Sequence, residues 1–326
     1  MTSRTCTGFF AVLAIVAGNS GCERADVYAI TGESAGGGST GGNSSVGGSA
    51  GGDSTGGQSA VPSTCPSPLP AGDTSRTVQV GSLSRTYVLH IPPAYDGIQP
   101  VPLVVDFHAI GVTGWGELSN SPYPAVTDPE GVVMAFPDGV TGPIGTAWNM
   151  GPCCVADVDD LAFTRALVAD IQGIACVDPE RIYAVGVLTG GGMVHHLACH
   201  AADVFAAVAP AAFDLLEETV DDCRPSRPIT VISFRGTADA RVPYEGGYSA
   251  VVPGMPITFL GAAGTFERWG QIDGCTGDPS EPDSSGCSSY SGCSDGVEVI
   301  LCTEEGGGEE PGDANIAWPV LSRHSL

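Results

Sequence analysis

The chain has 326 residues, of which 42% are hydrophobic, enough to form a substantial core. Its 37 acidic residues against 12 basic ones give a formal net charge of −25, which argues against binding to nucleic acid or to an anionic lipid surface. All the basic residues are Arg, so catalysis by a lysine amine is excluded.

The first 22 residues resemble an export signal. Arg4 supplies one positive charge, and the apolar run from Phe9 to Ala17 is too short to span a bilayer but suits the hydrophobic region of a signal peptide. The segment ends in small residues and Cys22, as in a bacterial lipobox, whose cysteine is lipidated; Asn19 stands where such motifs usually carry Leu. We therefore expect the protein to be exported. Whether it is lipidated at Cys22 or simply secreted remains open.

Residues 23–64 are predicted to form a flexible linker. From Ser34 to Ser59 the sequence is almost wholly Gly, Ser, Thr, Asn and Ala, a composition that cannot bury a core. Such a linker, placed after a lipid anchor at Cys22, would act as a membrane tether for the folded domain, which we expect to span residues 65–326.

The folded domain alternates predicted strands with a predicted helix. An alternating strand at an edge or in a hairpin is expected at 85–93, and short apolar runs typical of strands covered on both faces follow at 101–109, 131–139, 181–187, 205–213 and 229–239. Acidic residues followed by apolar residues at helical spacing predict a helix over 157–175. This order indicates an α/β fold with a doubly wound, mostly parallel sheet, in which ligands bind at the carboxyl ends of strands.

Ten cysteines remain when Cys6 and Cys22 are set aside, an even number that favours disulfides in an exported protein. For Cys176 and Cys199, which lie in apolar stretches, the alternative of a buried free thiol remains open. Four others lie in Gly/Ser-rich sequence and predict a stapled loop region: Cys275, Cys287, Cys293 and Cys302. Zinc is the alternative there, but no CxxC pair or nearby His supports it.

Candidate catalytic positions follow the predicted strands. The segment Gly186-Val187-Leu188-Thr189-Gly190 has the Gly-x-Ser-x-Gly spacing of a nucleophile elbow, with Leu188 at the position of the serine. Asp239 ends a later strand, and a glycine-rich loop ends another. Upstream, His108-Ala109 follows a strand where an oxyanion-hole amide would lie. The order nucleophile, acid, base is the one that α/β-hydrolases use.

These segments resemble the secreted polyhydroxybutyrate depolymerase and feruloyl esterase-like family of α/β-hydrolases. The matching stretches run in family order from about Arg76 to Pro319 and include RTYVLHIPPAYDG, PLVVDFHAIG, EGVVMAFPDG, VDDLAFTRALVADI, DPERIYAVGV, GGGMVHHLAC and CRPSRPITVISFRGTADARVPY. The resemblance implies an α/β-hydrolase fold and a carboxylic ester hydrolase, with an ester-bearing small molecule or polymer as partner, no cofactor, no metal and a monomeric state.

Carried over by position, the resemblance places the nucleophile at Leu188, the acid at Asp239 and the base at Glu309, so that only the acid is intact. The oxyanion hole falls on the backbone of Ala109 and Thr189. Leucine has no atom that attacks a carbonyl, and loss of a serine nucleophile costs about 10⁶ in turnover in a comparable enzyme. Glutamate is a poor base at neutral pH and would add repulsion beside Asp239.

Two functions compete on this basis. One is an active secreted esterase for a polyester or hydroxycinnamoyl ester, which needs an unrecognised nucleophile; the hydroxyl of Thr189 is the nearest candidate. The other, which the sequence favours, is a protein with lost or strongly impaired catalysis that binds ester or polysaccharide-linked ligands. That the substitutions are engineered or arise from sequence error stays a third interpretation.

Several further residues have both a functional and a structural interpretation. His108, Trp115 and Trp148 are predicted to contact substrate. Trp115, Tyr123 and Trp148 follow strands, where they suit the lining of an acyl or aryl pocket and ordinary packing equally well. His196 and His200 share a helix face at metal-ligand spacing, but we expect packed histidines. Three acidic residues in the first turn of the predicted helix suit a helix N-terminus better than calcium: Asp157, Asp159 and Asp160.

Overall fold

The structure, a computed structural model, describes residues 65–142, 144–250 and 257–326. The predicted signal peptide at 1–22, the lipidation site at Cys22 and the linker at 23–64 lie outside the described residues. Within the described ranges, no helix is both long and apolar enough to cross a membrane.

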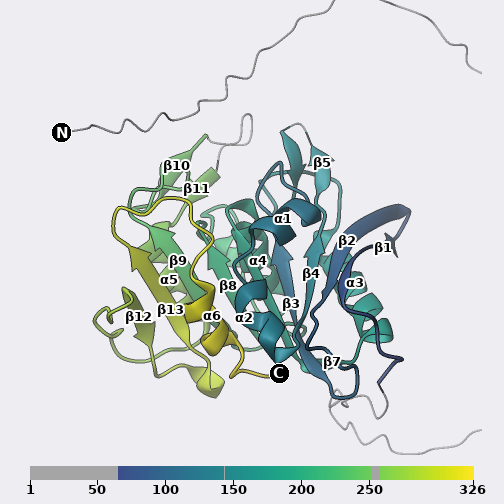
Figure 1. The fold of residues 1–326 in the computed structure, drawn as a ribbon. Coiled ribbons are helices and arrows are strands. Elements are labelled where there is room, and N and C mark those ends of the chain that lie inside the picture. The colour runs from purple at the N-terminus through teal and green to yellow at the C-terminus, as the bar shows by residue number, and fades with distance from the viewer. Residues whose placement is uncertain (1–64, 143, 251–256) are drawn as a thin grey trace, which may run out of the picture. The chain divides into compact units, whose positions relative to one another are not determined.

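A nine-stranded sheet forms the centre of the domain, in the order β1-β2-β4-β3-β7-β8-β9-β13-β12 (Figure 1). The six strands from β4 to β13 in this order run parallel, and β1, β2 and β12 are antiparallel to their neighbours. The strands are β1 (Gly72–Val80), β2 (Leu83–Ile91), β3 (Val101–Phe107), β4 (Val133–Pro137), β7 (Val177–Val187), β8 (Ala207–Ala211), β9 (Thr230–Gly236), β12 (Cys287–Tyr290) and β13 (Val299–Glu304). The predicted doubly wound, mostly parallel sheet is confirmed.

Helices cover both faces of this sheet (Figure 1). One face packs against α3 (Asp160–Ile174), α4 (Thr189–His200) and α5 (Gly261–Ile272), and the other against α1 (Gly114–Asn120), α2 (Pro124–Thr127) and α6 (Ala314–Leu321). Short 3₁₀ turns occur at Asp128–Glu130, Val220–Asp222 and Ser294–Gly296. Two hairpins, β5 (Val140–Gly142) with β6 (Gly145–Ala147) and β10 (Gly247–Ser249) with β11 (Ile257–Phe259), lie near the carboxyl ends of the parallel strands.

The central strands are apolar throughout because both of their faces are buried. In β3, Val105 packs into the core on the side of α3 to α5, while Val104 packs on the side of α1, α2 and α6. The same alternation in β7 sends Ala184 to the first core and Tyr183 to the second. This is the pattern expected of parallel strands between two helical layers.

All ten cysteines of the described residues form disulfides, so free thiols at Cys176 and Cys199 are ruled out. The pairs are Cys65–Cys176, Cys153–Cys154, Cys199–Cys223, Cys275–Cys293 and Cys287–Cys302. The last two pairs staple the Gly/Ser-rich region beside β12 and β13, as predicted, without zinc. Disulfides of this number are typical of proteins that fold in an oxidising compartment.

The disulfides lead to a direct chemical prediction. Protein oxidised during folding and then denatured without reductant should show no reactive thiol beyond Cys6 and Cys22, because the other ten are paired. Thiol titration in denaturant, compared with a fully reduced sample, measures this. More thiols than Cys6 and Cys22 supply would contradict the pairing.

A buried carboxyl pair under α1 should make stability depend on pH. Asp106 of β3 and Glu117 of α1 are both buried, and the Ser121 hydroxyl donates to Asp106 Oδ2 at 2.6 Å. Burial raises the pKa of Asp106 to about 7, and burial together with the charge of Asp106 raises the pKa of Glu117 to about 8. Unfolded carboxyls have pKa values of about 4, so the folded state binds more protons between about pH 4 and pH 8.

The free energy of unfolding should therefore fall as pH rises through this window, since unfolding releases protons there. Denaturant titrations at about pH 5 and pH 8 measure this fall in the free energy of unfolding. Glu117→Gln should make the fall smaller, because only one of the two buried carboxyl groups then remains to release a proton on unfolding. Glu267→Gln, at an exposed position on α5, is the matched control and should leave the fall unchanged. An equal fall in the Glu117 variant and wild type would refute this origin of the pH dependence.

Candidate active site

Leu188 occupies the apex of a sharp turn between β7 and α4. Its backbone has φ 52° and ψ −123°, a left-handed conformation that a residue with a side chain adopts only under strain. The turn is fixed on both sides, because Leu188 N–H donates to the Ala211 carbonyl at 3.0 Å and Gly192 N–H donates to the Leu188 carbonyl at 3.0 Å. The strand, strained residue and helix together have the form of a nucleophile elbow.

Glycines allow this turn to lie close to the neighbouring strands. A Cβ added at Gly190 would come within 1.8 Å of the Phe107 carbonyl oxygen at the end of β3, and one at Gly191 within 2.4 Å of the Ala211 oxygen on β8. Any larger residue at either position would push the first turn of α4 off the sheet. The glycines thus hold position 188 at the carboxyl edge of the sheet.

The two predicted oxyanion-hole residues follow neighbouring strands of the sheet. Thr189 is the first residue of α4, where N–H groups have no partner inside the helix. Ala109 follows β3, and its carbonyl accepts from Val112 N–H at 3.1 Å and from the ring of His108 at 2.7 Å, which fixes the loop. Ends of neighbouring strands β3 and β7 therefore carry both predicted oxyanion positions.

Asp239 follows β9 and is buried, with 7% of its surface exposed. Its Oδ1 accepts from the backbone N–H groups of Arg241 at 2.8 Å and Val242 at 2.9 Å. Its Oδ2 is buried and has no hydrogen-bond partner among the described residues. A buried carboxylate oxygen without a partner costs free energy, and this one is free to accept a donor such as a histidine N–H.

Glu309 lies on the loop after β13, and that loop is attached to the Asp239 loop. The N–H of Ala238 donates to the Gly307 carbonyl at 2.8 Å, and the N–H of Thr237 donates to the Glu304 carbonyl at 3.0 Å. The Glu309 carboxylate forms an ion pair with Arg241, with 3.0 Å between Oε2 and the guanidinium. The structure therefore brings the acid and base positions onto adjoining loops, with Glu309 turned to Arg241 and Asp239 Oδ2 unpaired.

A buried ion pair that the sequence reasoning missed supports the acid loop. Arg235 of β9 contacts Asp214 and donates to the Val242 carbonyl at 2.7 Å, and both charged side chains are nearly inaccessible. Burial raises the pKa of Asp214 to about 6, which still leaves the group charged at neutral pH. The sequence could have predicted this ion pair, because Arg235 lies inside the apolar run ITVISFRG and a charge in a buried strand needs a partner.

The predicted substrate contacts divide into buried and exposed residues. His108 is fully buried, and its Nε2 accepts from Gly139 N–H at 2.9 Å. Trp148 is also fully buried, stacks near His108 and donates to its carbonyl at 2.9 Å. Both side chains thus support the Ala109 loop from inside the protein. Trp115 is 46% exposed and donates to the Ser75 hydroxyl at 3.0 Å, on the side of β1.

Two of the three acidic residues at the start of α3, Asp159 and Asp160, have structural partners. Asp159 caps the helix by accepting from Ala162 N–H at 2.8 Å, and buried Asp160 pairs with Arg85 at 2.7 Å. Asp160 also accepts from Asn149 N–H at 2.7 Å, which ties α3 to the Trp148 loop. Among the described residues, no group of three or more His, Cys, Asp or Glu side chains is arranged to hold a metal ion.

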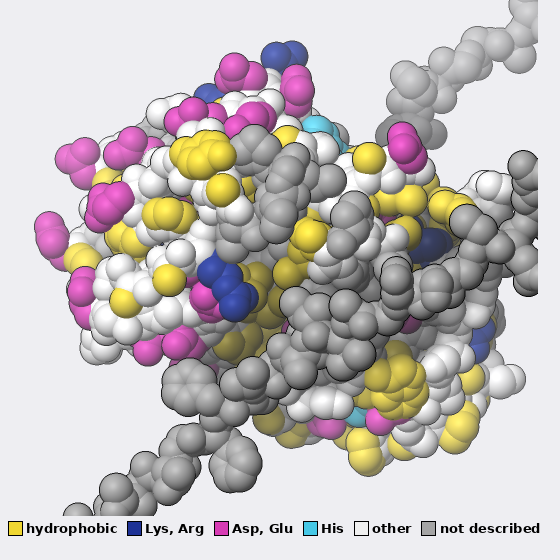
Figure 2. Space-filling view, turned by 90° about the horizontal axis from the view of Figure 1, so that it is seen from above, with side chains coloured by type: hydrophobic (Ala, Val, Ile, Leu, Met, Phe, Trp, Pro, Cys, Tyr) yellow, Lys and Arg dark blue, Asp and Glu magenta, His cyan; other side chains and the backbone are white. Residues whose placement is uncertain are grey.

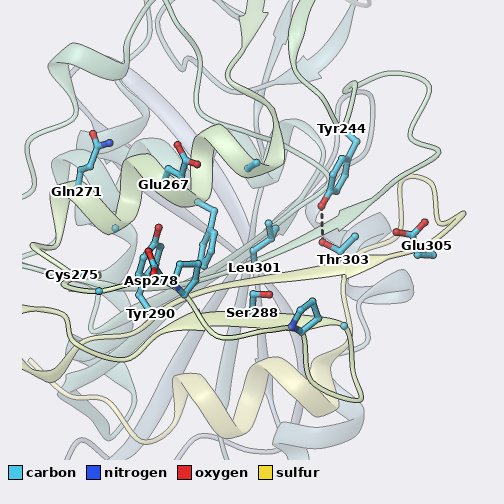
Figure 3. Close-up of a pocket in the computed structure, with 17 residues that line it drawn as sticks. Tyr244, Glu267, Gln271, Cys275, Asp278, Ser288, Tyr290, Leu301, Thr303 and Glu305 are labelled. Carbon is cyan, nitrogen blue, oxygen red and sulfur yellow. Dashed lines mark hydrogen bonds between the residues drawn. The ribbon is translucent and has the colours of Figure 1, made fainter.

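A cavity of about 780 Å³ lies beside α5, β12 and β13 (Figure 3). Tyr290 and Phe266 lie inside it, and Tyr244 shares a hydrogen bond of 2.8 Å with Thr303 on its wall. None of its lining residues is Leu188, Asp239 or Glu309. This cavity is therefore separate from the elbow, although Tyr244 belongs to the loop that follows Asp239.

The edge of the sheet that carries the elbow faces the viewer in Figure 2. On its described surface, acidic side chains are numerous and basic ones few, in keeping with the net charge of −25. An anionic ligand would meet a negative potential on approach, so a neutral ester fits this surface better.

The sequence is similar to known esterases. It is 44% identical to feruloyl esterase B of Piromyces equi over 247 residues, which are 74% of this chain and 46% of that protein. It is 28% identical to feruloyl esterase C of Emericella nidulans over 228 residues, 66% of this chain and 78% of that one. The chain thus spans less than half of the Piromyces protein. No family model matches the chain.

The fold is similar to that of solved esterases. An acetyl xylan esterase from Aspergillus awamori superposes with a TM-score of 0.55 at 13% identity, over 76% of this chain and 98% of that one. At this identity the likeness concerns the fold alone. Together with the strand order and the elbow, it confirms the predicted α/β-hydrolase fold.

Proposed function

We propose that this chain is an exported esterase-type α/β-hydrolase that has lost catalysis by the serine mechanism and binds an ester ligand at the retained site. The similarity to feruloyl esterases supports a hydroxycinnamoyl ester as the ligand. The five disulfides support export. Lipidation at Cys22 and a membrane tether, a polyester ligand of the polyhydroxybutyrate type and a monomeric state remain predictions.

One observation carries the proposal: the elbow keeps its strained backbone while its apex is Leu188. An aliphatic side chain has no lone pair with which to form an acyl-enzyme. The absence of a histidine base is consistent with a second observation: the buried Oδ2 of Asp239 has no hydrogen-bond donor among the described residues. The scaffold of the site is thus retained, whereas two of its three reactive groups are replaced.

Thr189 is the one hydroxyl that favours an active esterase, since it directly follows the apex. Its Oγ1 is buried and has no hydrogen-bond partner among the described residues, so no base activates it. This burial also keeps the hydroxyl away from a substrate carbonyl. The location of Thr189 therefore favours a role for its backbone N–H over one for its hydroxyl.

Two measurements on the full chain test the proposal. Hydrolysis of p-nitrophenyl acetate, methyl ferulate and 3-hydroxybutyrate oligomers should not exceed the rate in buffer, and a phosphonate probe should label no residue. Methyl ferulate should nevertheless bind, as followed by its fluorescence or by calorimetry. Turnover that Asp239→Ala abolishes, or a probe adduct on any hydroxyl, would establish the active esterase instead.

A further inference from the structure

Two histidines on α4 lie next to each other and line one cavity. His196 and His200 are one helical turn apart, and their ring centroids are 4.6 Å apart. Both line a cavity of about 240 Å³ beside the helix. Imidazoles four residues apart on one helix face can bind the same metal ion, each through one nitrogen at about 2.0–2.1 Å. Rings 4.6 Å apart are close enough for this.

A carboxylate lines the same cavity. Asp222 ends the 3₁₀ turn Val220–Asp222 and is exposed. The segment that carries it is tied to α4, because the next residue, Cys223, is disulfide-bonded to Cys199, which directly precedes His200. The disulfide thus keeps the turn with Asp222 beside the helix with the two histidines.

The charges around the histidines suit a cation. Burial lowers the pKa of His196 to about 4 and also lowers that of His200, so both rings are neutral at pH 7 and keep a free lone pair. Asp159 lies near His196 and Asp222 near His200, close enough to raise these pKa values in part. Arg165 contacts only the His200 backbone carbonyl, and Asp203 neutralises it through bonds of 2.7 Å.

His195, the remaining histidine of the helix, is already used. Trp269 Nε1–H donates to its Nδ1 at 3.2 Å, and its Nε2 lies 3.3 Å from the Phe213 carbonyl. Both of its ring nitrogens therefore have protein partners. The rings of His196 and His200, by contrast, contact each other, and neither forms a ring hydrogen bond with another described residue.

We propose that His196 and His200 form a binding site for a late first-row divalent metal ion, Cu²⁺, Zn²⁺ or Ni²⁺. The two imidazoles supply the protein ligands, water fills the other positions, and Asp222 accepts a hydrogen bond from a bound water. Imidazole is a ligand that these metals prefer over Mg²⁺ or Ca²⁺. The site is two turns along α4 from Leu188 and is independent of ester binding.

Metal titration of the full chain tests the site, after its free thiols have been alkylated. Zn²⁺ binding measured by calorimetry should weaken about tenfold or more in His196→Gln and in His200→Gln, because a single imidazole cannot chelate. With Cu²⁺, the electron paramagnetic resonance spectrum should show coupling to two nitrogens in the wild type and to fewer in either variant. Saturating Zn²⁺ should also raise the melting temperature of the wild type, but not that of His196→Gln or His200→Gln.

Matched controls separate this site from other metal binding. His324→Gln, at a histidine paired with Glu298, should leave the affinity unchanged. Asp222→Asn should weaken binding, whereas Asp221→Asn, at a 95% exposed neighbour, should not. His200 is exposed, so its variant remains informative even if His196→Gln fails to fold. Equal Zn²⁺ affinity in wild type and His200→Gln would overturn the proposal.

Discussion

The double variant Leu188→Ser/Glu309→His should hydrolyse p-nitrophenyl acetate and methyl ferulate at a rate clearly above that of the unaltered chain. The elbow already has the required backbone, with φ 52° at position 188, and a serine there would project from the same apex. A histidine at 309 would lie on the loop that adjoins Asp239, whose Oδ2 has no donor at present. The variant thus supplies a nucleophile and a base beside Asp239, the predicted acid, which is already present.

The single variants should stay close to the rate in buffer. In a comparable serine hydrolase, loss of either the serine or the histidine costs about as much as loss of the whole triad, roughly 10⁶ in kcat. We therefore expect the double variant to exceed either single variant by about 10²-fold or more, because the residues act as a unit. Initial rates and active-site titration measure this. Asp239→Asn added to the double variant is the control and should remove the gain.

Activity in Leu188→Ser alone, equal to that of the double variant, would contradict this prediction. It would mean that a group other than position 309 serves as the base. Arg241 also bears on the result, since its ion pair with Glu309 is lost when histidine replaces that carboxylate.

Arg235→Met should destabilise the protein by about 3–5 kcal/mol, because it leaves the buried Asp214 without its counter-charge. The change also removes a donor from the Val242 carbonyl, next to the N–H that holds Asp239. Urea denaturation at pH 7 gives the free energy of unfolding. Protonation of Asp214 would relieve part of the cost, so the loss should be smaller at about pH 5 than at pH 7.

Two comparisons make this result specific. The double variant Arg235→Met/Asp214→Leu should recover most of the lost stability, since it leaves no buried charge. Arg165→Met breaks an exposed pair with Asp203 and should cost at most about 1 kcal/mol. If Arg235→Met and Arg165→Met had the same effect, the buried pair would not support the acid loop.

The sequence predicted those parts of the fold that depend on local pattern. Apolar runs marked the strands buried on both faces, and the helix over 157–175 corresponds to α3, which begins one residue after its cap at Asp159. The glycine spacing located the elbow because close packing on β3 and β8 admits no larger residue. Sequence reasoning missed β1, β12, the two short hairpins and the helices α1, α2, α5 and α6, and β7 begins four residues before the predicted strand.

The remaining features depend on contacts between distant segments. Which cysteines pair is decided by the packing of strands and loops, and no spacing in the sequence reveals it. The partner of Arg235 lies 21 residues earlier, on the loop after β8. Nor could the sequence show that Trp148 and His108 are fully buried or that Glu309 contacts Arg241, since both follow from how loops fold over the sheet.

The Cys65–Cys176 disulfide has a consequence for proteolysis. It joins the first described residue to the segment just before β7, across 111 positions of the chain. A protease that cuts before Cys65 would therefore remove the leading 64 residues while every cross-link of the domain stays closed. If Cys22 carries lipid, one such cut would release the domain, for which we propose ester binding, from the cell surface as a folded unit.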